Sequence, residues 1–163
     1  MNRKALLELA DFLETLDPKR FDIRTWRMPS KGKPGFVSDE QLLNDQQTVA
    51  CPVGWGCLLD SWKQAGLYIA SCYVGEEQLS NPLSKPHVMS LVRTKLNDEF
   101  DSYEAVDISL NLYPGMAAVL FNPDNYADEE FTDAKTVAER IRDFCLVSED
   151  DIANTVLSYS DSD

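Results

Sequence analysis

The sequence has one histidine and four cysteines among its 163 residues. Cys51, Cys57, Cys72 and Cys145 are too few and too scattered for the disulfide framework of a small secreted domain, so free thiols are expected. A zinc site is not predicted, because structural zinc sites use paired ligands such as Cys-x-x-Cys, and Cys51 and Cys57 are six positions apart. No glycine-rich phosphate-binding loop is present either, so we expect no metal and no cofactor.

Long apolar runs are also missing. No stretch approaches the roughly 18 to 20 apolar residues that span a bilayer. The N-terminus begins with basic residues, as a signal peptide does, but Glu8, Asp11 and Glu14 occupy the part that would have to be apolar. The sequence therefore predicts a cytoplasmic protein with no membrane partner.

Basic residues are scarce: 15 Lys and Arg stand against 28 Asp and Glu, giving a net charge of −13. The imbalance is uneven, because residues 1–33 have a local charge of +3 and residues 34–163 a local charge of −16. Such a surface repels nucleic acids and anionic membranes and attracts basic partners. It serves solubility, and it also fits docking on a basic protein surface.

The hydrophobic pattern predicts a mainly α fold of five to seven helices, with room for a small two-stranded β element. We expect one compact domain over residues 1–157 and a disordered tail over residues 158–163. Residues 67–75 have the composition of a strand, and residues 103–110 fit a short strand or a turn before a helix. The helices are predicted at residues 3–16, 39–46, within 48–66, from 86 to 100, and at 114–121, 134–145 and 148–156.

Two glycines lie inside the helix predicted within residues 48–66. Gly54 and Gly56 each cost about 1 kcal/mol relative to alanine in a helix interior. Their presence predicts either that another backbone packs closely there or that the helix begins only after Gly56.

Several segments are similar to those of a known group of proteins. These segments are Phe21-Asp22 with Trp26, the Thr-Val-Ala-Cys stretch leading to Gly54-Trp55, the Leu-Phe-x-Pro-x-x-Tyr stretch from Leu120 to Tyr126, and Val137 to Ile141. The chain thereby resembles, over about half its length, a loose group of small uncharacterised proteins encoded by bacteriophages and bacteria. The resemblance implies a phage or prophage origin and a host cytoplasm as location. The group has no assigned activity, so it assigns no role to any residue.

Two charged clusters are candidate partner-binding sites. The first is a basic arm over residues 19–33, in which aromatic side chains alternate with cations: Lys19, Arg20, Arg24, Trp26, Arg27, Lys31 and Lys33. This mixture can bind phosphates and stack bases, or it can fold against the acidic remainder of the chain, which is the interpretation we favour. The second cluster is acidic and comprises Asp124, Asp128, Glu129 and Glu130.

A catalytic thiol is the third candidate. Cys51 precedes Pro52 at a predicted helix N-terminus, where the helix dipole can lower the pKa of a thiol. It would need a base, and His87 is the one histidine available. A buried cysteine in a stripe of small residues explains the same pattern.

No catalytic residue is assigned, and the sequence favours a non-enzyme. The working hypothesis is a non-catalytic accessory factor that binds a basic host protein through its acidic surface. A small enzyme using Cys51 or a carboxylate pair, and a nucleic-acid binder using residues 19–33, remain as alternatives. The charge argues against nucleic acid as the partner and leaves a homo-oligomer open.

Overall fold

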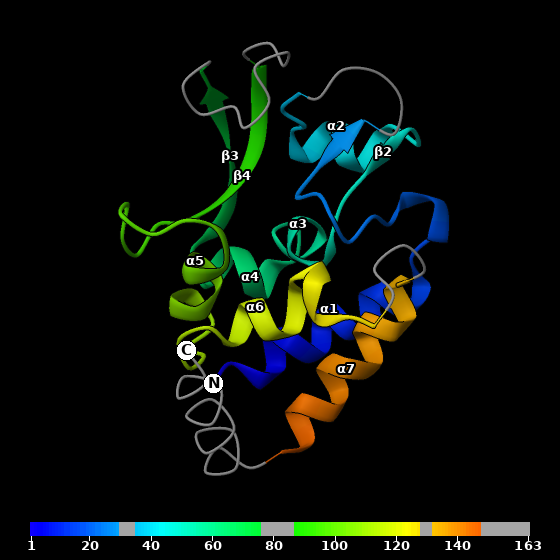
Figure 1. Cartoon of the computed structure of the whole chain (residues 1–163), viewed down its shortest axis with the longest axis vertical. Coiled ribbons are helices and arrows are strands. Elements are labelled where there is room, and N and C mark those ends of the chain that lie inside the picture. Colours follow the sequence, from blue (N-terminus) through cyan, green and yellow to red (C-terminus); the bar gives the residue numbers. More distant parts are fainter. Residues whose placement is uncertain (30–34, 76–86, 128–131, 148–163) are drawn as a thin grey trace.

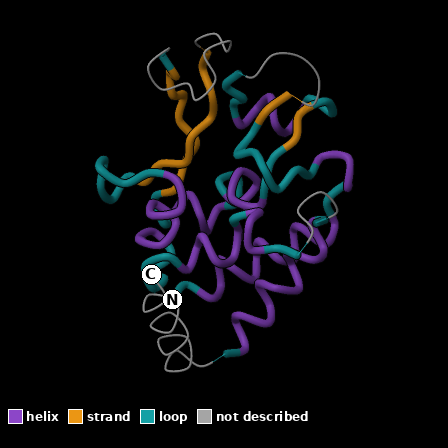
Figure 2. Tube along the Cα trace, in the orientation of Figure 1, coloured by secondary structure: helices purple, strands orange, loops and turns teal. Residues whose placement is uncertain are grey.

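The computed structural model describes residues 1–29, 35–75, 87–127 and 132–147. This part of the chain contains seven α-helices and two antiparallel two-stranded sheets, with 49% helix and 17% strand. Most of the helices lie in the lower half of Figure 1, with the strands above them, and Figure 2 shows the same division. The predicted mainly α class is therefore wrong, because the domain is mixed α/β. None of the helices in the described ranges has the length and apolarity that crossing a bilayer requires.

The two longest helices, α1 (Arg3–Thr15) and α7 (Ala134–Leu146), pack side by side although they are far apart in the sequence (Figure 1). The buried leucines of α1 and the buried Val137 and Ile141 of α7 follow the helical spacing that predicted them. Across their exposed edge, Arg142 contacts Asp11 at 2.7 Å and Glu14 at 3.0 Å. Both helix predictions are confirmed, and this pair forms the base of the main hydrophobic core.

Residues 48–66 form two short helices, α3 (Pro52–Gly56) and α4 (Asp60–Gln64), instead of one. A Cβ placed on Gly54 would lie 1.7 Å from the carbonyl oxygen of Trp26, so the predicted close approach of another backbone is confirmed there. Gly56 instead faces the ring of Trp62, which is fully buried and donates its indole N–H to a backbone carbonyl of α1. The glycines thus mark close packing on both sides of α3.

The strands β3 (Leu67–Val74) and β4 (His87–Thr94) pair in register from Leu67↔Thr94 to Val74↔His87. The predicted strand over residues 67–75 is confirmed, but the helix predicted from residue 86 is wrong. Val88 and Val92 stand four residues apart, which fits a helix, yet they also stand on one face of a strand. Pairing with β3 satisfies the backbone of this segment and buries Val92 completely, so a non-local partner overrides the local periodicity.

Residues 103–110 were predicted as a strand or turn, and the structure places them in α5 (Ser102–Ser109) and the residue after it. Val106 and Leu110 are fully buried whereas Ile108 is 38% exposed, which is a helical pattern of burial and not an alternating one. The next helix, α6 (Met116–Phe121), follows the predicted position and ends at Asn122, before the 3₁₀ turn η3 (Pro123–Asn125).

A smaller layer lies beside the β3–β4 pair. It contains the 3₁₀ turn η1 (Pro18–Arg20), the short pair β1 (Met28–Pro29) and β2 (Thr48–Val49), and α2 (Asp39–Asn44). The helix predicted at residues 39–46 is confirmed as α2. It begins with a capping box, in which the side chains of Ser38 and Gln41 each accept from the other's backbone N–H group. A second buried cluster lies here, with Trp55 and Leu42 at its centre.

The predicted helix at residues 148–156 and the tail at residues 158–163 lie outside the described residues.

Candidate functional site

Arg20 of the basic arm is buried and binds the protein's own backbone. Its guanidinium donates hydrogen bonds to the carbonyl oxygens of Leu42, Asp45 and Thr48, at and beyond the end of α2. It also lies over the ring of Trp55, 4.8 Å from the ring centre, and the Trp55 indole donates to the Arg20 carbonyl. These contacts satisfy helix-end carbonyls that would otherwise lack donors. Arg20 is therefore engaged within the fold and presents little surface to a phosphate backbone.

Other members of the arm also have local partners. Arg24 bonds Asp22 at 3.1 Å on the surface, and Lys19 is exposed. Trp26 is half-buried, and its ring meets that of Tyr103 edge-on at 5.0 Å between centres. An indole packed in this way is not an open stacking platform for a base. Lys31 and Lys33 lie outside the described residues.

Arg27 is the most unusual member, because its side chain is 0% exposed. Its Nε donates to the carbonyl of Gly54 at 3.0 Å, and its Nη1 donates to Asp39 at 2.6 Å. Its Nη2 is buried and has no hydrogen-bond partner among the described residues. A buried guanidinium nitrogen without an acceptor is costly, so the burial of Arg27 opposes part of the stability that its other two hydrogen bonds supply.

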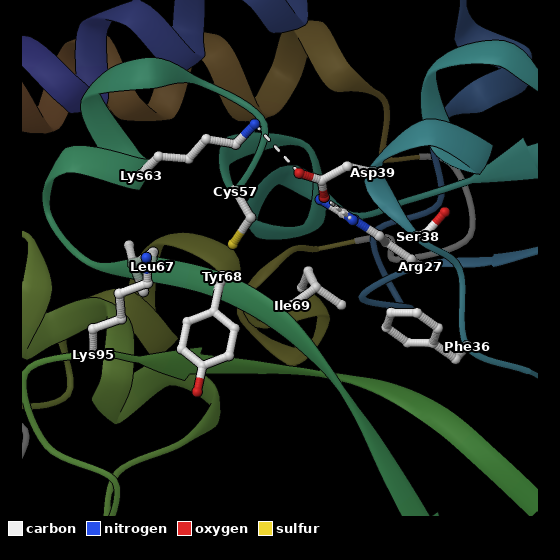
Figure 3. A pocket seen from close by; sticks show the side chains of 10 residues that line it. All are labelled: Arg27, Phe36, Ser38, Asp39, Cys57, Lys63, Leu67, Tyr68, Ile69 and Lys95. Carbon is white, nitrogen blue, oxygen red and sulfur yellow. Dashed lines mark hydrogen bonds and ion pairs between the residues drawn. The ribbon is translucent and has the colours of Figure 1, made fainter.

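Arg27 lies in the wall of a cavity of about 330 Å³, which we call the cationic cavity (Figure 3). The cavity lies where β3 meets the ends of α3 and α4 and the start of α2. Its lining is Arg27, Phe36, Ser38, Asp39, Cys57, Lys63, Leu67, Tyr68, Ile69 and Lys95.

Asp39 joins two cations of this cavity. Its second carboxylate oxygen lies 3.3 Å from the ammonium of Lys63, while the first accepts from Arg27. Burial works to raise the pKa of Asp39, but the hydrogen bonds and charges of Arg27 and Lys63 together hold that pKa below its ordinary value. Asp39 is therefore ionised at neutral pH and compensates one positive charge of the cluster.

Cys51 lies at a helix N-terminus, as the alternative of a catalytic thiol requires, but its pKa is raised and not lowered. Cys51 does occupy the N-cap of α3, where its sulfur accepts from the N–H of Gly54 at 3.5 Å. However, it is buried, and burial raises the pKa of Cys51 to about 12. Cys57 is also buried, and burial raises its pKa to about 12 as well. Both thiols are therefore protonated at neutral pH, the opposite of an activated nucleophile.

The predicted acidic cluster is only partly visible. Asp124 is exposed in η3, while Asp128, Glu129 and Glu130 lie outside the described residues. The sequence shows that this cluster belongs to a longer segment: residues 96–134 contain ten Asp and Glu and no Lys, Arg or His. The described part of this segment includes α5 and α6.

A second cavity, of about 410 Å³, lies between α5 and α6, and among the described residues its lining comes from residues 100–118 of this base-free segment. We call it the acidic cavity. Its apolar wall contains Phe100, Tyr103, Ile108, Leu112 and Pro114, and its acidic residues are Glu104, which is exposed, and Asp107, which is buried. It thus combines an apolar interior with negative charge.

Asp107 also holds the start of α6 in place. Its two carboxylate oxygens accept the backbone N–H groups of Ala117 at 2.6 Å and Gly115 at 2.7 Å. Burial raises the pKa of Asp107 to about 6, against the lowering effect of these hydrogen bonds and with a further raising contribution from Glu104. Because both oxygens are engaged by backbone donors, Asp107 has a structural role in this cavity.

The sequence analysis identified Arg27 but not Lys63, Lys95 or Asp39, which line the same cavity. These residues are isolated in the sequence and meet only through the fold, so no local signal indicates them. The acidic cavity had a signal that was missed, namely the thirty-nine residues without a base. Within the described ranges, no three His, Cys, Asp or Glu side chains come together as a set that could hold a metal ion.

Comparisons with protein-family models, with curated proteins and with solved structures find no match to this chain, so its function has to be inferred from the geometry above.

Proposed function

We propose that the protein is a non-catalytic binding protein that engages a basic segment of a partner protein at the acidic cavity. The observation that carries this proposal is that the described lining of an apolar cavity comes from a segment with no basic residue. An apolar anchor of the partner would enter between Phe100 and Ile108, and a neighbouring Lys or Arg would face Glu104. Buried apolar anchors supply affinity at such interfaces, and complementary charge supplies rate and specificity.

Burial of two arginines supports the same proposal. Arg20 and Arg27 are 8% and 2% exposed, so their two positive charges are buried. The surface of the protein is therefore more acidic than its composition alone suggests. With a phage or prophage origin, which remains a prediction from the resemblance, the partner would be a host protein. A nucleic-acid partner is disfavoured, because that alternative depended on the basic arm over residues 19–33. Two cations of this arm, Arg20 and Arg27, are buried and cannot bind phosphates.

The alternative of a thiol enzyme is also disfavoured. A catalytic Cys51 would have to be a thiolate, but burial raises its pKa and keeps the thiol protonated at neutral pH. A carboxylate-pair enzyme would rely on Glu104 and Asp107, and the oxygens of Asp107 are already bound to backbone donors.

The test is affinity capture from host lysate at low and moderate salt with two matched double variants. E99Q/E104Q removes two exposed charges from the acidic segment, and E40Q/E139Q removes two exposed charges on α2 and α7. We expect one stoichiometric partner that E99Q/E104Q loses and E40Q/E139Q retains, and that I108S also loses although it changes no charge. Equal loss in both double variants would show unspecific charge attraction and would refute a defined site.

A further inference from the structure

One edge of the β3–β4 pair has no backbone partner in the described structure. The N–H of Lys95 donates to the carbonyl of Gly66 at 2.9 Å, so Gly66 and Lys95 form a hydrogen-bonded pair. Hydrogen-bonded and non-hydrogen-bonded pairs alternate along an antiparallel ladder, so every second residue from Leu67 to Tyr73 points its backbone N–H and C=O groups away from β4. Within the described ranges, no backbone group outside the β3–β4 pair bonds to β3.

β3 lacks the features that protect an exposed edge from pairing. Natural edge strands avoid pairing through charged side chains, proline, bulges or short length. β3 has eight residues, none of them charged and none proline, and its register with β4 runs without a bulge. The edge of β4 is by contrast partly occupied, because Arg93 forms an isolated bridge with Asp101. The edge of β3 is therefore a place where a further strand can pair.

The distal half of the β3–β4 pair has little packing of its own. Tyr73 and Val88 are partners across the two strands, and they are 65% and 41% exposed. Figure 1 shows this part of the pair extending above the helices. Two strands alone are marginally stable in water, whereas three or more strands with an apolar face are stable. Strands added at the β3 edge would therefore stabilise this part of the fold.

Charge favours a second copy of the chain as the source of the added strand. Two copies with a net charge of −13 repel each other at long range, but residues 61–75 contain no Asp or Glu, so two copies can approach at β3 without that repulsion. The two ends of β3 also differ in charge. Lys63 and Lys95 line the same cavity as the first residues of the strand, whereas the sequence continues beyond the strand with Glu76 and Glu77. Antiparallel pairing of two copies brings these unlike ends together, and parallel pairing would bring like ends together.

β3 is also complementary to itself. With a two-fold axis at Ser71, each residue of β3 lies opposite the residue equally far beyond Ser71 in the other copy. Ile69 then lies opposite Tyr73 of the other copy, and Ala70 opposite Cys72. Pairs of an aromatic and a β-branched side chain stabilise antiparallel sheets. The same register sets the outward N–H and C=O groups of the two strands opposite each other.

We propose that the protein forms a two-fold symmetric dimer in which the β3 edges of two copies pair antiparallel about Ser71. The two β3–β4 pairs then form one continuous sheet of four strands, with both β3 strands at its centre. A two-fold contact of this kind uses the same surface on both copies and is closed, so it does not propagate into a filament. The dimer is independent of the acidic cavity between α5 and α6, and its absence would leave the proposed function unchanged.

The test is sedimentation velocity of the wild type, S71K and S71E at increasing protein concentration. Ser71 is exposed, so either longer side chain fits the monomer, and circular dichroism checks that each variant is folded. In the dimer, residue 71 of one copy faces residue 71 of the other, so a like charge on both copies opposes pairing. We expect the wild type to change from monomer to dimer, and S71K and S71E each to remain monomeric at the same concentrations.

A mixture of S71K and S71E locates the axis. Opposite charges then meet at residue 71, so the mixture should restore a dimer with one copy of each variant. Q46K and Q46E make the same changes in charge at an exposed position after α2 and should dimerise as the wild type does.

Amide hydrogen exchange followed by NMR tests the same edge. The N–H groups of Ala70 and Cys72 point to β4 and should be protected at every concentration. Those of Ile69, Ser71 and Tyr73 should exchange rapidly in the dilute wild type, become protected as the dimer forms, and exchange rapidly at every concentration in S71K. A wild type that stays monomeric, a dimer that S71K and S71E leave intact, a mixture of the two that stays monomeric, or an assembly that keeps growing with concentration would each overturn the proposal.

Discussion

Replacing Gly54 by alanine tests the packing on which the cationic cavity depends. The added Cβ would lie 1.7 Å from the carbonyl oxygen and 2.8 Å from the carbonyl carbon of Trp26. Contact at an ordinary distance needs a shift of about 1.5 Å, and the obstacle is backbone, which cannot rotate away as a side chain can. The residues that follow Trp26 include Arg27, so the shift also displaces the guanidinium from the carbonyl of Gly54.

The magnitude follows from three contributions. Overpacking a well-packed site costs about 1–3 kcal/mol. Losing the hydrogen bond from Arg27 to the Gly54 carbonyl adds about 1.5–3 kcal/mol, because the donor is charged. The higher helix propensity of alanine returns about 1 kcal/mol. We therefore expect G54A to lower the free energy of unfolding by about 3 kcal/mol, which is a fall in Tm of about 6–12 °C for a domain of this size.

The assay is urea unfolding followed by tryptophan fluorescence and circular dichroism, with G56A as the matched control. In G56A the new Cβ would lie 2.8 Å from ring atoms of Trp62, which is a side chain, so part of the overlap can relax by rotation. We expect G56A to be less destabilised than G54A. A G54A protein as stable as the wild type would refute the reasoning.

Three further predictions concern titratable groups. D107A leaves two backbone N–H groups at the start of α6 without their acceptor. A denaturant titration should show a free energy of unfolding lower by about 2–4 kcal/mol. A loss below about 0.5 kcal/mol would show that Asp107 does not hold α6 in place. Because the folded pKa of Asp107 is about 6 and its ordinary value 3.8, its protonation favours the folded state fully below about pH 4, and this contribution disappears as pH rises to about 6. D107N should therefore lose that part of the pH dependence when unfolding is measured from pH 4 to 7, and an unchanged profile would contradict the raised pKa. At pH 8 a thiol reagent should label the half-buried Cys72 in the native protein, but Cys51 and Cys57 only after unfolding. Peptide mass mapping would identify the labelled residues. Rapid labelling of Cys51 in the native protein would support the alternative of a thiol enzyme.

Local signals predicted the elements whose stability is local. The predicted positions of α1, α2 and α7 were correct, because each helix depends on side chains within a few turns of one another. The segment of β4 was misassigned for the opposite reason. Its valines fit both a helical and an extended period, and the choice is made by hydrogen bonding to β3, which no local pattern contains.

The candidate sites divide in the same way. The sequence of the basic arm fits nucleic-acid binding or internal pairing, and we favoured internal pairing; only the fold shows that Arg20 caps α2 and that Arg27 bonds Asp39. Lys63 and Lys95 are ordinary surface lysines in the sequence and become part of a cavity only through the junction of β3, β4 and α4. The acidic character of the second cavity could have been predicted, because the thirty-nine residues of the base-free segment can be recognised in the sequence alone.

The packing of α1 on α7 has a consequence for biosynthesis. The ion pair between Asp11 and Arg142 joins residues 131 positions apart. At about 5–20 residues per second, translation needs about 7–26 s to add the residues that separate Asp11 from Arg142. During this interval Leu6, Leu9 and Leu13 have no helix α7 to cover them, and uncovered apolar surface of this kind is what chaperones bind. The last long helix therefore completes the core that the first one begins.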